Sequence, residues 1–285
     1  MEKKTALILE GGGFRAMFSA GILELFLEKE LFFESVYGVS AGAAYGVSYV
    51  SKQKGRNIAV NEMIGDKRYC SWNNLIREGT MFSWDFIYEE IPQSIIPFDY
   101  NALKNSPSKF YVGTSNCNTG QPEFFLLNDA DKKDFRILLA ASGSLPFIAP
   151  MVHYDNKVLM DGGLSESVPF EYALNNGNDR AVVILTQPKN YLKGPMKHTA
   201  LFKWYYRKFP KVYEMLLTRA ERYNTSIAKL EQLEKDGVVF IIRPKETLDI
   251  KRVENNPEKT AAIYHAAMEQ ANEEFSLLRK WLGEK

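Results

Sequence analysis

Short apolar runs alternate with amphipathic segments along the first part of the chain. Residues 5–9 form an apolar run that three glycines close, and residues 35–39 form a second one. Between them, residues 14–30 carry apolar side chains at helical spacing, and residues 41–50 are small and apolar. Buried strands and the helices that cover them give these two patterns. The strand–helix–strand–helix order predicts a parallel sheet with helices on both faces.

The same patterns continue as far as residue 187. They predict strands at 109–114, 124–127, 158–160 and 181–185, and helices at 133–141 and 169–174. Residues 51–105 mix basic and aromatic residues with two prolines and show no sustained periodicity. We therefore expect short helices and loops there, which would lie over the site as a cap.

The composition changes after residue 187, where Lys, Arg, Trp and Tyr become frequent. A long helical stretch at 197–233, interrupted by Pro210, precedes a strand at 238–242 and an amphipathic helix at 257–281. We expect an α/β fold with three α/β/α layers, a mainly parallel central sheet and a helix-rich C-terminal extension. The expected domains are 1–190 and, packed on it, 191–285.

Composition and charge exclude several classes of protein. The chain has 285 residues, of which 45% are hydrophobic and 25% charged, as in ordinary globular proteins. A net charge of +1 gives no electrostatic reason to expect nucleic acid as a partner. Cys70 and Cys117 have no metal-ligand spacing and are expected to be free thiols in a reducing compartment.

No apolar run is long enough to cross a bilayer. The run at residues 6–9 is also too short for the core of a signal peptide. We therefore expect a cytoplasmic protein, and peripheral contact with the inner face of the membrane stays open. The sequence does not indicate an oligomeric state.

The segment Gly38-Val39-Ser40-Ala41-Gly42 has the Gly-x-Ser-x-Gly pattern between a predicted strand and a predicted helix. A serine on such a sharp turn projects its hydroxyl outward, and Gly38, Ala41 and Gly42 are small enough to allow the turn. The pattern favours a nucleophilic serine. The alternative is a serine that caps the following helix.

The segment Gly11-Gly12-Gly13-Phe14-Arg15 lies between the first predicted strand and its helix. Consecutive glycines let backbone N–H groups approach an anion, and the helix start adds its positive end. Arg15 either assists the anion or fixes the loop. Together with Ala16, the segment also fits a dinucleotide-binding loop, which makes a nicotinamide- or flavin-dependent oxidoreductase the competing hypothesis.

The dinucleotide hypothesis requires an acidic residue at the end of the second strand. The second predicted strand ends instead at Ser40, and Glu28, Glu30 and Glu34 all precede it. The competing hypothesis therefore lacks its ribose-binding residue.

A nucleophilic serine needs a base. His153, His198 and His265 have no strand end or small neighbours beside them, so we expect surface or structural roles for all three. Asp161 follows a short strand and precedes two glycines. It is expected at the carboxyl end of the sheet, where burial beside an apolar pocket would raise its proton affinity. An Asp-Gly turn residue is the alternative.

These residues resemble the patatin-like phospholipases. That family has a Gly-Gly-Gly-x-Arg loop after its first strand, a Gly-x-Ser-x-Gly elbow and an Asp-Gly-Gly turn, and this chain shows all three in that order. Residues 141–150 also resemble the block that precedes the family's aspartate, and the likeness covers about residues 5–187.

The resemblance implies a serine acyl hydrolase with Ser40 as nucleophile and Asp161 as base, without a histidine. It assigns the oxyanion hole to Gly11, Gly12 and Gly13 with Arg15, and it implies a lipid or acyl-ester substrate, no cofactor and no metal. Residues 1–190 would be the catalytic domain, and residues 191–285 lie outside the family core.

Two positions depart from the family pattern. Glu10 stands where the family often has Asp, and Ala16 stands where a glycine often follows the arginine. Neither change removes a reacting group, so a catalytically idle lipid-binding protein is a weaker alternative. Residues 201–209 mix aromatic and cationic side chains, which is typical of an interfacial helix but also of a helix packed on the core by one face.

Overall fold

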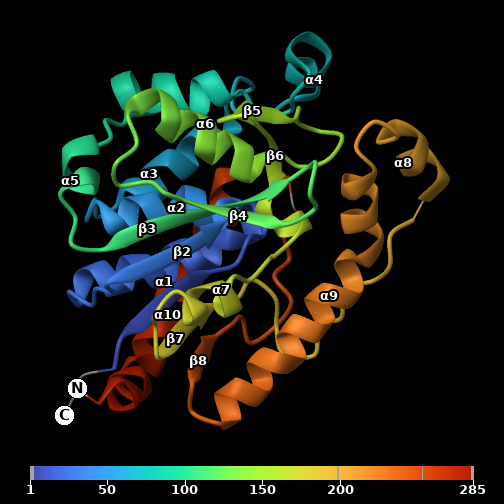
Figure 1. Cartoon of the computed structure of the whole chain (residues 1–285). Helices are drawn as coiled ribbons and strands as arrows, with labels where there is room; N and C mark the ends of the chain where they lie inside the picture. Colours follow the sequence, from blue (N-terminus) through green and yellow to red (C-terminus); the bar gives the residue numbers. More distant parts are fainter. Residues whose placement is uncertain (1–2, 198, 252, 284–285) are drawn as a thin grey trace.

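A mixed eight-stranded sheet runs through the molecule and carries the candidate residues at its strand ends (Figure 1). This computed structural model describes residues 3–197, 199–251 and 253–283. The strands are β1 (Thr5–Leu9), β2 (Ser35–Val39), β3 (Lys109–Asn116), β4 (Pro122–Leu126), β5 (Val152–Tyr154), β6 (Lys157–Asp161), β7 (Arg180–Ile184) and β8 (Val239–Ile242). They follow the order β5-β6-β3-β2-β1-β7-β8, with β4 also paired to β3.

The helices connect and cover these strands. They are η1 (Gly13–Ala16), α1 (Met17–Glu28), α2 (Ala41–Val50), α3 (Arg56–Asn61), η2 (Glu62–Gly65), α4 (Trp72–Glu78), η3 (Phe86–Ile95), α5 (Tyr100–Lys104), α6 (Lys132–Gly143), η4 (Gly162–Leu164), α7 (Phe170–Asn175), α8 (Thr199–Tyr205), α9 (Pro210–Lys235) and α10 (Pro257–Leu282). Most of them fall where the hydrophobic pattern predicts a helix.

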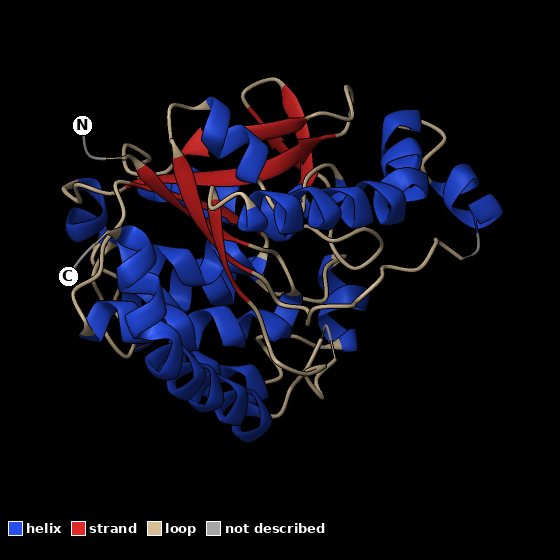
Figure 2. Ribbon diagram, turned by 90° about the horizontal axis from the view of Figure 1, so that it is seen from below, coloured by secondary structure: helices blue, strands red, loops and turns tan. Residues whose placement is uncertain are grey.

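Alternate residues of the central strands point to opposite faces of the sheet. Leu7 and Leu9 pack with α1, α2, α6 and α10 on one face, whereas Ala6 and Ile8 pack with α7 and α9 on the other. Figure 2 shows the long α9 lying across one face of the sheet, on the side opposite to α1 and α10. The structure thus confirms the predicted three-layer α/β/α class with helices on both faces.

The strand pairing is less uniform than the sequence indicates. β1, β2, β3, β7 and β8 run parallel, but β4 and β6 are antiparallel to β3. β4 pairs with β3 residues 111–115, so β2 and β6 must share the other edge of β3. Val39 of β2 pairs with Gly113, and Asp161 of β6 pairs with the next residue, Thr114. The ends of β2 and β6 therefore meet.

The region after residue 190 takes part in the same sheet. β8 pairs with β7, and α10 packs along α1 through Ala267, Ala271 and Leu278. Arg180 of β7 donates to the Thr5 hydroxyl and to the Trp281 carbonyl, each at 2.8 Å, so the end of α10 lies near the start of β1. The division at residue 190 stays a prediction, and the helix-rich C-terminal region that we expected is present as α9 and α10.

Candidate active site

Ser40 lies on the tight turn between β2 and α2. Its φ and ψ are 56° and −127°, a conformation that costs a non-glycine residue about 1–3 kcal/mol. A Cβ on Gly38 would lie 2.8 Å from the Ala43 Cα, and one on Gly42 would lie 2.6 Å from the Leu9 carbonyl oxygen. Ser40 makes no side-chain cap to α2, so the capping alternative is wrong.

The Ser40 hydroxyl faces Asp161 instead. Ser40 Oγ donates a hydrogen bond to Asp161 Oδ2 at 2.6 Å, and Asp161 is only 1% exposed. The other carboxylate oxygen, Oδ1, accepts from the Gly163 N–H at 2.8 Å. Asp161 is thus both the residue that caps its own turn and the hydrogen-bond acceptor for Ser40.

The route that brings Asp161 to Ser40 differs from the one expected. We expected Asp161 at the carboxyl edge because its strand would run with the others, but β6 runs the opposite way. It begins beyond the carboxyl end of β3 and stops at Thr114, next to the end of β2. The two side chains meet because the carboxyl ends of the two strands face each other along one edge of β3.

Ser142, at the end of α6, fixes the backbone of the turn. Its Oγ accepts from the Ser40 N–H at 2.8 Å and donates to the Gly113 carbonyl at 2.7 Å, and Ser142 is fully buried. One hydroxyl thereby connects the serine turn to the β3 residue that pairs with Val39.

The glycine loop lies directly beside the serine turn. A Cβ on Gly11 would lie 2.9 Å from the Ser40 Cβ, and one on Gly12 would lie 2.7 Å from the Thr186 Oγ1. Gly13 has a φ of 59°, which favours glycine, and it lines the pocket with Ser40. The Gly11 N–H donates to the Ser167 carbonyl at 3.4 Å.

Glu10, one of the two residues that depart from the family pattern, anchors this loop. It is 2% exposed, and its Oε2 accepts from the Thr186 N–H at 2.6 Å and from the Thr186 hydroxyl at 3.0 Å. Its Oε1 accepts from the Tyr223 hydroxyl at 2.9 Å. Burial raises the pKa of Tyr223 and the Glu10 charge adds to the rise, while the Arg15 charge opposes it. Arg15 therefore lies near this anchor.

Helix α9 also holds the turn that contains Asp161. Arg219 Nε donates to the Gly163 carbonyl at 2.7 Å, and Arg222 donates to the carbonyls of Leu164 and Met215. With Tyr223, these arginines form what we call the α9 clamp, which contacts both the aspartate turn and the anchor of the glycine loop.

An apolar pocket opens at Ser40. The segment predicted to be a cap supplies much of its wall, including Phe82, Trp84 and Tyr88. Leu145, which follows α6, also lines the pocket. The three cap rings stack in sequence, with centroids 5.6 and 5.8 Å apart. Such a surface suits an alkyl chain.

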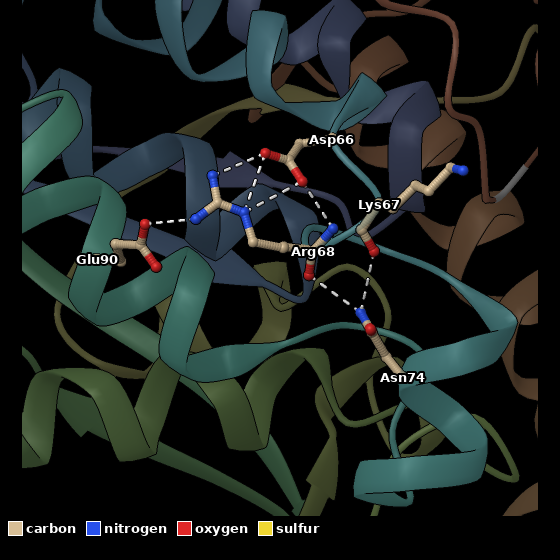
Figure 3. A network of polar contacts seen from close by, with 5 residues as sticks. All are labelled: Asp66, Lys67, Arg68, Asn74 and Glu90. Carbon is tan, nitrogen blue, oxygen red and sulfur yellow. Dashed lines mark hydrogen bonds and ion pairs between the residues drawn. The ribbon is translucent and has the colours of Figure 1, made fainter.

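Polar contacts hold the cap in shape, as Figure 3 shows. The Arg68 guanidinium contacts the Asp66 carboxylate at 2.8 Å and the Glu90 carboxylate at 2.6 Å. These contacts join the loop after η2 to η3. The buried Asn74 of α4 donates to the Arg68 carbonyl at 3.0 Å. The Arg68 and Glu90 side chains are about half exposed.

The sequence predicts surface or structural roles for the three histidines. His153 and His265 are exposed, and His198 lies outside the described residues.

No cluster of three or more His, Cys, Asp or Glu side chains suited to a metal occurs among the described residues. Within the same ranges, no helix is long and apolar enough to cross a membrane.

Comparison with known proteins identifies the family. Residues 7–174 match the family model described as patatin-like phospholipase. The chain belongs to the patatin-like phospholipase family. Membership of this family indicates that the glycine loop belongs to a hydrolase rather than to a dinucleotide-binding enzyme. Residues 209–283, which include α9 and α10, match a domain of unknown function (DUF6363).

Individual relatives are distant. The uncharacterized protein YjjU of Escherichia coli K12 is 27% identical over 206 residues, which cover 70% of this chain and 57% of that protein. This chain thus matches little more than half of that relative's length. Among solved structures, VipD from Legionella pneumophila gives a TM-score of 0.47 at 13% identity, covering 96% of this chain and 66% of that one. The type III effector ExoU gives 0.40 at 12% identity, covering 97% and 53%.

Sequence reasoning missed the residues that support the site. Ser142 stands inside the block that we compared with the family, but a buried serine has no distinctive signal there. Thr186, Arg219 and Tyr223 lie outside every motif. Only the three-dimensional contacts identify them, because Tyr223 lies 213 residues from its partner Glu10.

Proposed function

We propose that this protein is a serine acyl hydrolase that cleaves fatty-acyl esters of phospholipids, lysophospholipids or related lipids. One observation carries the proposal: the Ser40 hydroxyl lies 2.6 Å from the buried Asp161 carboxylate, at the mouth of an apolar pocket. Membership of the patatin-like phospholipase family supports a lipid ester as substrate.

The first step is acylation of Ser40. Asp161 Oδ2 accepts the hydroxyl proton as Ser40 Oγ attacks the acyl carbonyl carbon. The amides of Gly12 and Gly13 are the candidate donors to the resulting oxyanion, because the Gly11 N–H already donates to the Ser167 carbonyl. Each donor of this kind contributes about 3 kcal/mol to lowering the barrier. The C–O bond of the ester then breaks, and the departing alcohol oxygen takes the proton from Asp161.

The second step frees the acyl group. Asp161 accepts a proton from a water molecule, whose oxygen attacks the acyl carbon of the Ser40 ester. The bond to Ser40 Oγ breaks, Asp161 returns the proton to Oγ, and the fatty acid leaves. Arg15, beside the Glu10 anchor, is proposed to fix the glycine loop during both steps.

A catalytically idle lipid-binding protein would keep the pocket but would not need a hydrogen-bonded Ser40 and Asp161. Hydrolysis of a p-nitrophenyl acyl ester and of phosphatidylcholine distinguishes the two. We expect Ser40→Ala and Asp161→Asn each to lower kcat by at least about a thousandfold. The exposed Ser94→Ala and Asp155→Asn are matched controls that should retain wild-type rates. Wild-type protein that hydrolyses neither ester would refute the enzyme.

Peripheral membrane contact is the second part of the proposal. Residues 188–213, after β7, contain no Asp or Glu but seven basic residues: Lys189, Lys193, Lys197, Lys203, Arg207, Lys208 and Lys211. Within this segment, α8 exposes Leu201, Trp204 and Tyr205. Exposed aromatic and aliphatic groups among cations favour an anionic lipid surface.

The loop beside the pocket links α8 with a second helix, α4, that also has exposed apolar side chains. Phe147 stacks on Phe202 of α8, with ring centroids 4.4 Å apart, and the Ile148 carbonyl accepts from the Met81 N–H, just after α4. On α4, Trp72 is 69% and Ile76 84% exposed. Figure 1 shows α4 and α8 projecting from the body of the molecule.

Co-sedimentation with vesicles of phosphatidylglycerol or phosphatidylcholine tests the contact. We expect binding to the anionic vesicles at low salt, and we expect Trp204→Ser and Ile76→Ser each to weaken it several-fold. Leu277→Ser on α10 is the control, because Leu277 is exposed to the same degree (61% against 63% for Trp204) but lies on another helix. Equal losses in all three variants, or no binding at all, would remove this part of the proposal.

A further inference from the structure

A second cavity lies behind the pocket at Ser40. The two cavities share wall residues, among them Ala44, Tyr45, Tyr69 and Tyr88, so the tyrosines stand at their junction. From there the second cavity extends along α2 to Val47 and reaches Arg56 at the start of α3. Val47 is seven residues beyond Ser40, which corresponds to roughly 10 Å along a helix.

Arg56 is an unusual group to find in the wall of an apolar cavity. Its guanidinium donates to the Ile96 carbonyl at 3.1 Å and stacks on the Phe98 ring at 5.1 Å, but its Nε is buried without an acceptor. Burial lowers the pKa of Arg56 to about 10, with opposing contributions from Tyr100 and Tyr69, so it stays charged at neutral pH. Among the described residues, no carboxylate forms an ion pair with it.

Three tyrosines and Trp84 add further donors to the walls of the two cavities, which also include the Asn57 amide, a donor to the Tyr45 carbonyl at 3.1 Å. Burial raises the pKa values of Tyr45, Tyr69 and Tyr88, so all three hydroxyls keep their protons. The Trp84 Nε1–H, in the wall of the first cavity, is buried without an acceptor. Arg56 is the one charged residue among the described residues that line the two cavities, and the Arg56 Nε–H and the Trp84 Nε1–H are buried donors without an acceptor, which an anionic oxygen would supply.

We propose that the second cavity is an oxyanion site that recognises a negatively charged group of the ester substrate, with Arg56 as its counter-ion. The proposal rests on the proposed function, because it places the scissile ester at Ser40. Two substrate groups share this chemistry: a carboxylate at the far end of the acyl chain, and the phosphate of a lipid headgroup. In either case a neutral hydrocarbon end leaves the donors unpaired, so selectivity for the charged substrate follows.

Two pairs of substrates test the site. The first pair is p-nitrophenyl octanoate and the mono-p-nitrophenyl ester of octanedioic acid, which has the same chain length and a terminal carboxylate. The second pair is a monoacylglycerol and the lysophosphatidate with the same acyl group. For each pair the readout is the ratio of kcat/KM for the charged ester to kcat/KM for the neutral one.

Three variants are compared with the wild type. We expect Arg56→Met to lower the ratio about tenfold in at least one pair. Tyr88→Phe, which removes only a hydroxyl, should lower the same ratio less and covers the case that Arg56→Met does not fold. Arg136→Met removes a partly exposed arginine that is paired with Asp85 and Glu89, and it should leave both ratios unchanged.

The pair that responds identifies the source of the oxyanion. A loss confined to the octanedioate pair assigns the acyl end, and a loss confined to the lysophosphatidate pair assigns the headgroup. Hydrolysis with both ratios unchanged in Arg56→Met and Tyr88→Phe would overturn this inference alone. If the wild type hydrolyses none of the four esters, the proposed function itself fails.

Discussion

The Tyr223 hydroxyl donates a hydrogen bond to the Glu10 carboxylate at 2.9 Å, which joins α9 to the residue directly before the glycine loop. Tyr223 is 4% exposed, and Glu10 also accepts two hydrogen bonds from Thr186. The C-terminal part of the chain is therefore connected to the site by a buried contact. Its arginines Arg219 and Arg222 reach the aspartate turn from the same helix.

Removing the Tyr223 hydroxyl should loosen the glycine loop. Tyr223→Phe leaves one oxygen of a buried carboxylate without its donor, which costs about 1–3 kcal/mol of unfolding free energy. We also expect a lower kcat. Urea unfolding and ester hydrolysis measure the two effects, and Tyr213→Phe on the same helix is the control. If both tyrosine variants behave alike, the anchor has no special role.

Ser142 should matter more for catalysis than its neighbour Ser144, although both are fully buried. Ser142 Oγ bonds the Ser40 N–H, whereas Ser144 Oγ bonds only the Ala140 carbonyl of its own helix. We expect Ser142→Ala to lower kcat about tenfold with little change in KM, because the serine turn loses its fixed orientation. Steady-state kinetics compare it with Ser144→Ala. Equal kcat values for the two variants would contradict the assignment.

Gly42 should not tolerate a methyl group. A Cβ there would lie 2.6 Å from the Leu9 carbonyl oxygen, so Gly42→Ala forces α2 away from β1. We expect a loss of about 2 kcal/mol in unfolding free energy and a loss of activity. Gly194→Ala is the control, since no atom lies within 4 Å of its added Cβ. A stable and active Gly42→Ala protein would show that the elbow is not tightly packed.

Glu166, close to the aspartate turn, predicts a pH dependence of stability. Burial, with a contribution from Glu171, raises the pKa of Glu166 from 4.5 to about 7. Between these values the unfolded chain has released a proton that the folded chain keeps, so stability falls as pH rises from 4.5 to 7. Below pH 4.5 both states are protonated, and this loss is absent. Above pH 7 the loss is complete, at most about 3 kcal/mol.

Glu166→Gln should therefore melt at a higher temperature than the wild type at pH 8. The difference should shrink at pH 5, where the wild-type side chain is mostly protonated in the folded state. Glu214→Gln, an exposed position on α9, serves as the control. A Glu166→Gln stability difference that does not change between the two pH values would contradict the buried, protonated state of this residue.

The sequence predicts most of the fold because its central strands and helices have strong local patterns. The apolar runs at β1, β2 and β7 and the periodic residues of α10 match the structure closely. Strand direction is a different matter. The sequence of β6 does not show that it is antiparallel to β3, because direction depends on how the chain returns to the sheet.

The candidate site divides in the same way. Ser40, Asp161 and the three glycines belong to short motifs, so the sequence points to them, and the structure brings Ser40 and Asp161 into hydrogen-bond contact. Their supports do not belong to motifs. Ser142, Thr186 and Tyr223 act through tertiary contacts, and the donors around Arg56 form a site only after α2, α3 and the cap have packed together.

The most direct test of the account is to locate the residue that reacts with a fluorophosphonate probe. We expect peptide mass mapping of the labelled wild-type protein to find the adduct on Ser40, and we expect no adduct in Ser40→Ala. Asp161→Asn should label at least about a hundredfold more slowly, whereas Asp155→Asn should label at the wild-type rate. An adduct on a different serine, or equal labelling of Asp161→Asn and the wild type, would contradict the pairing of Ser40 with Asp161.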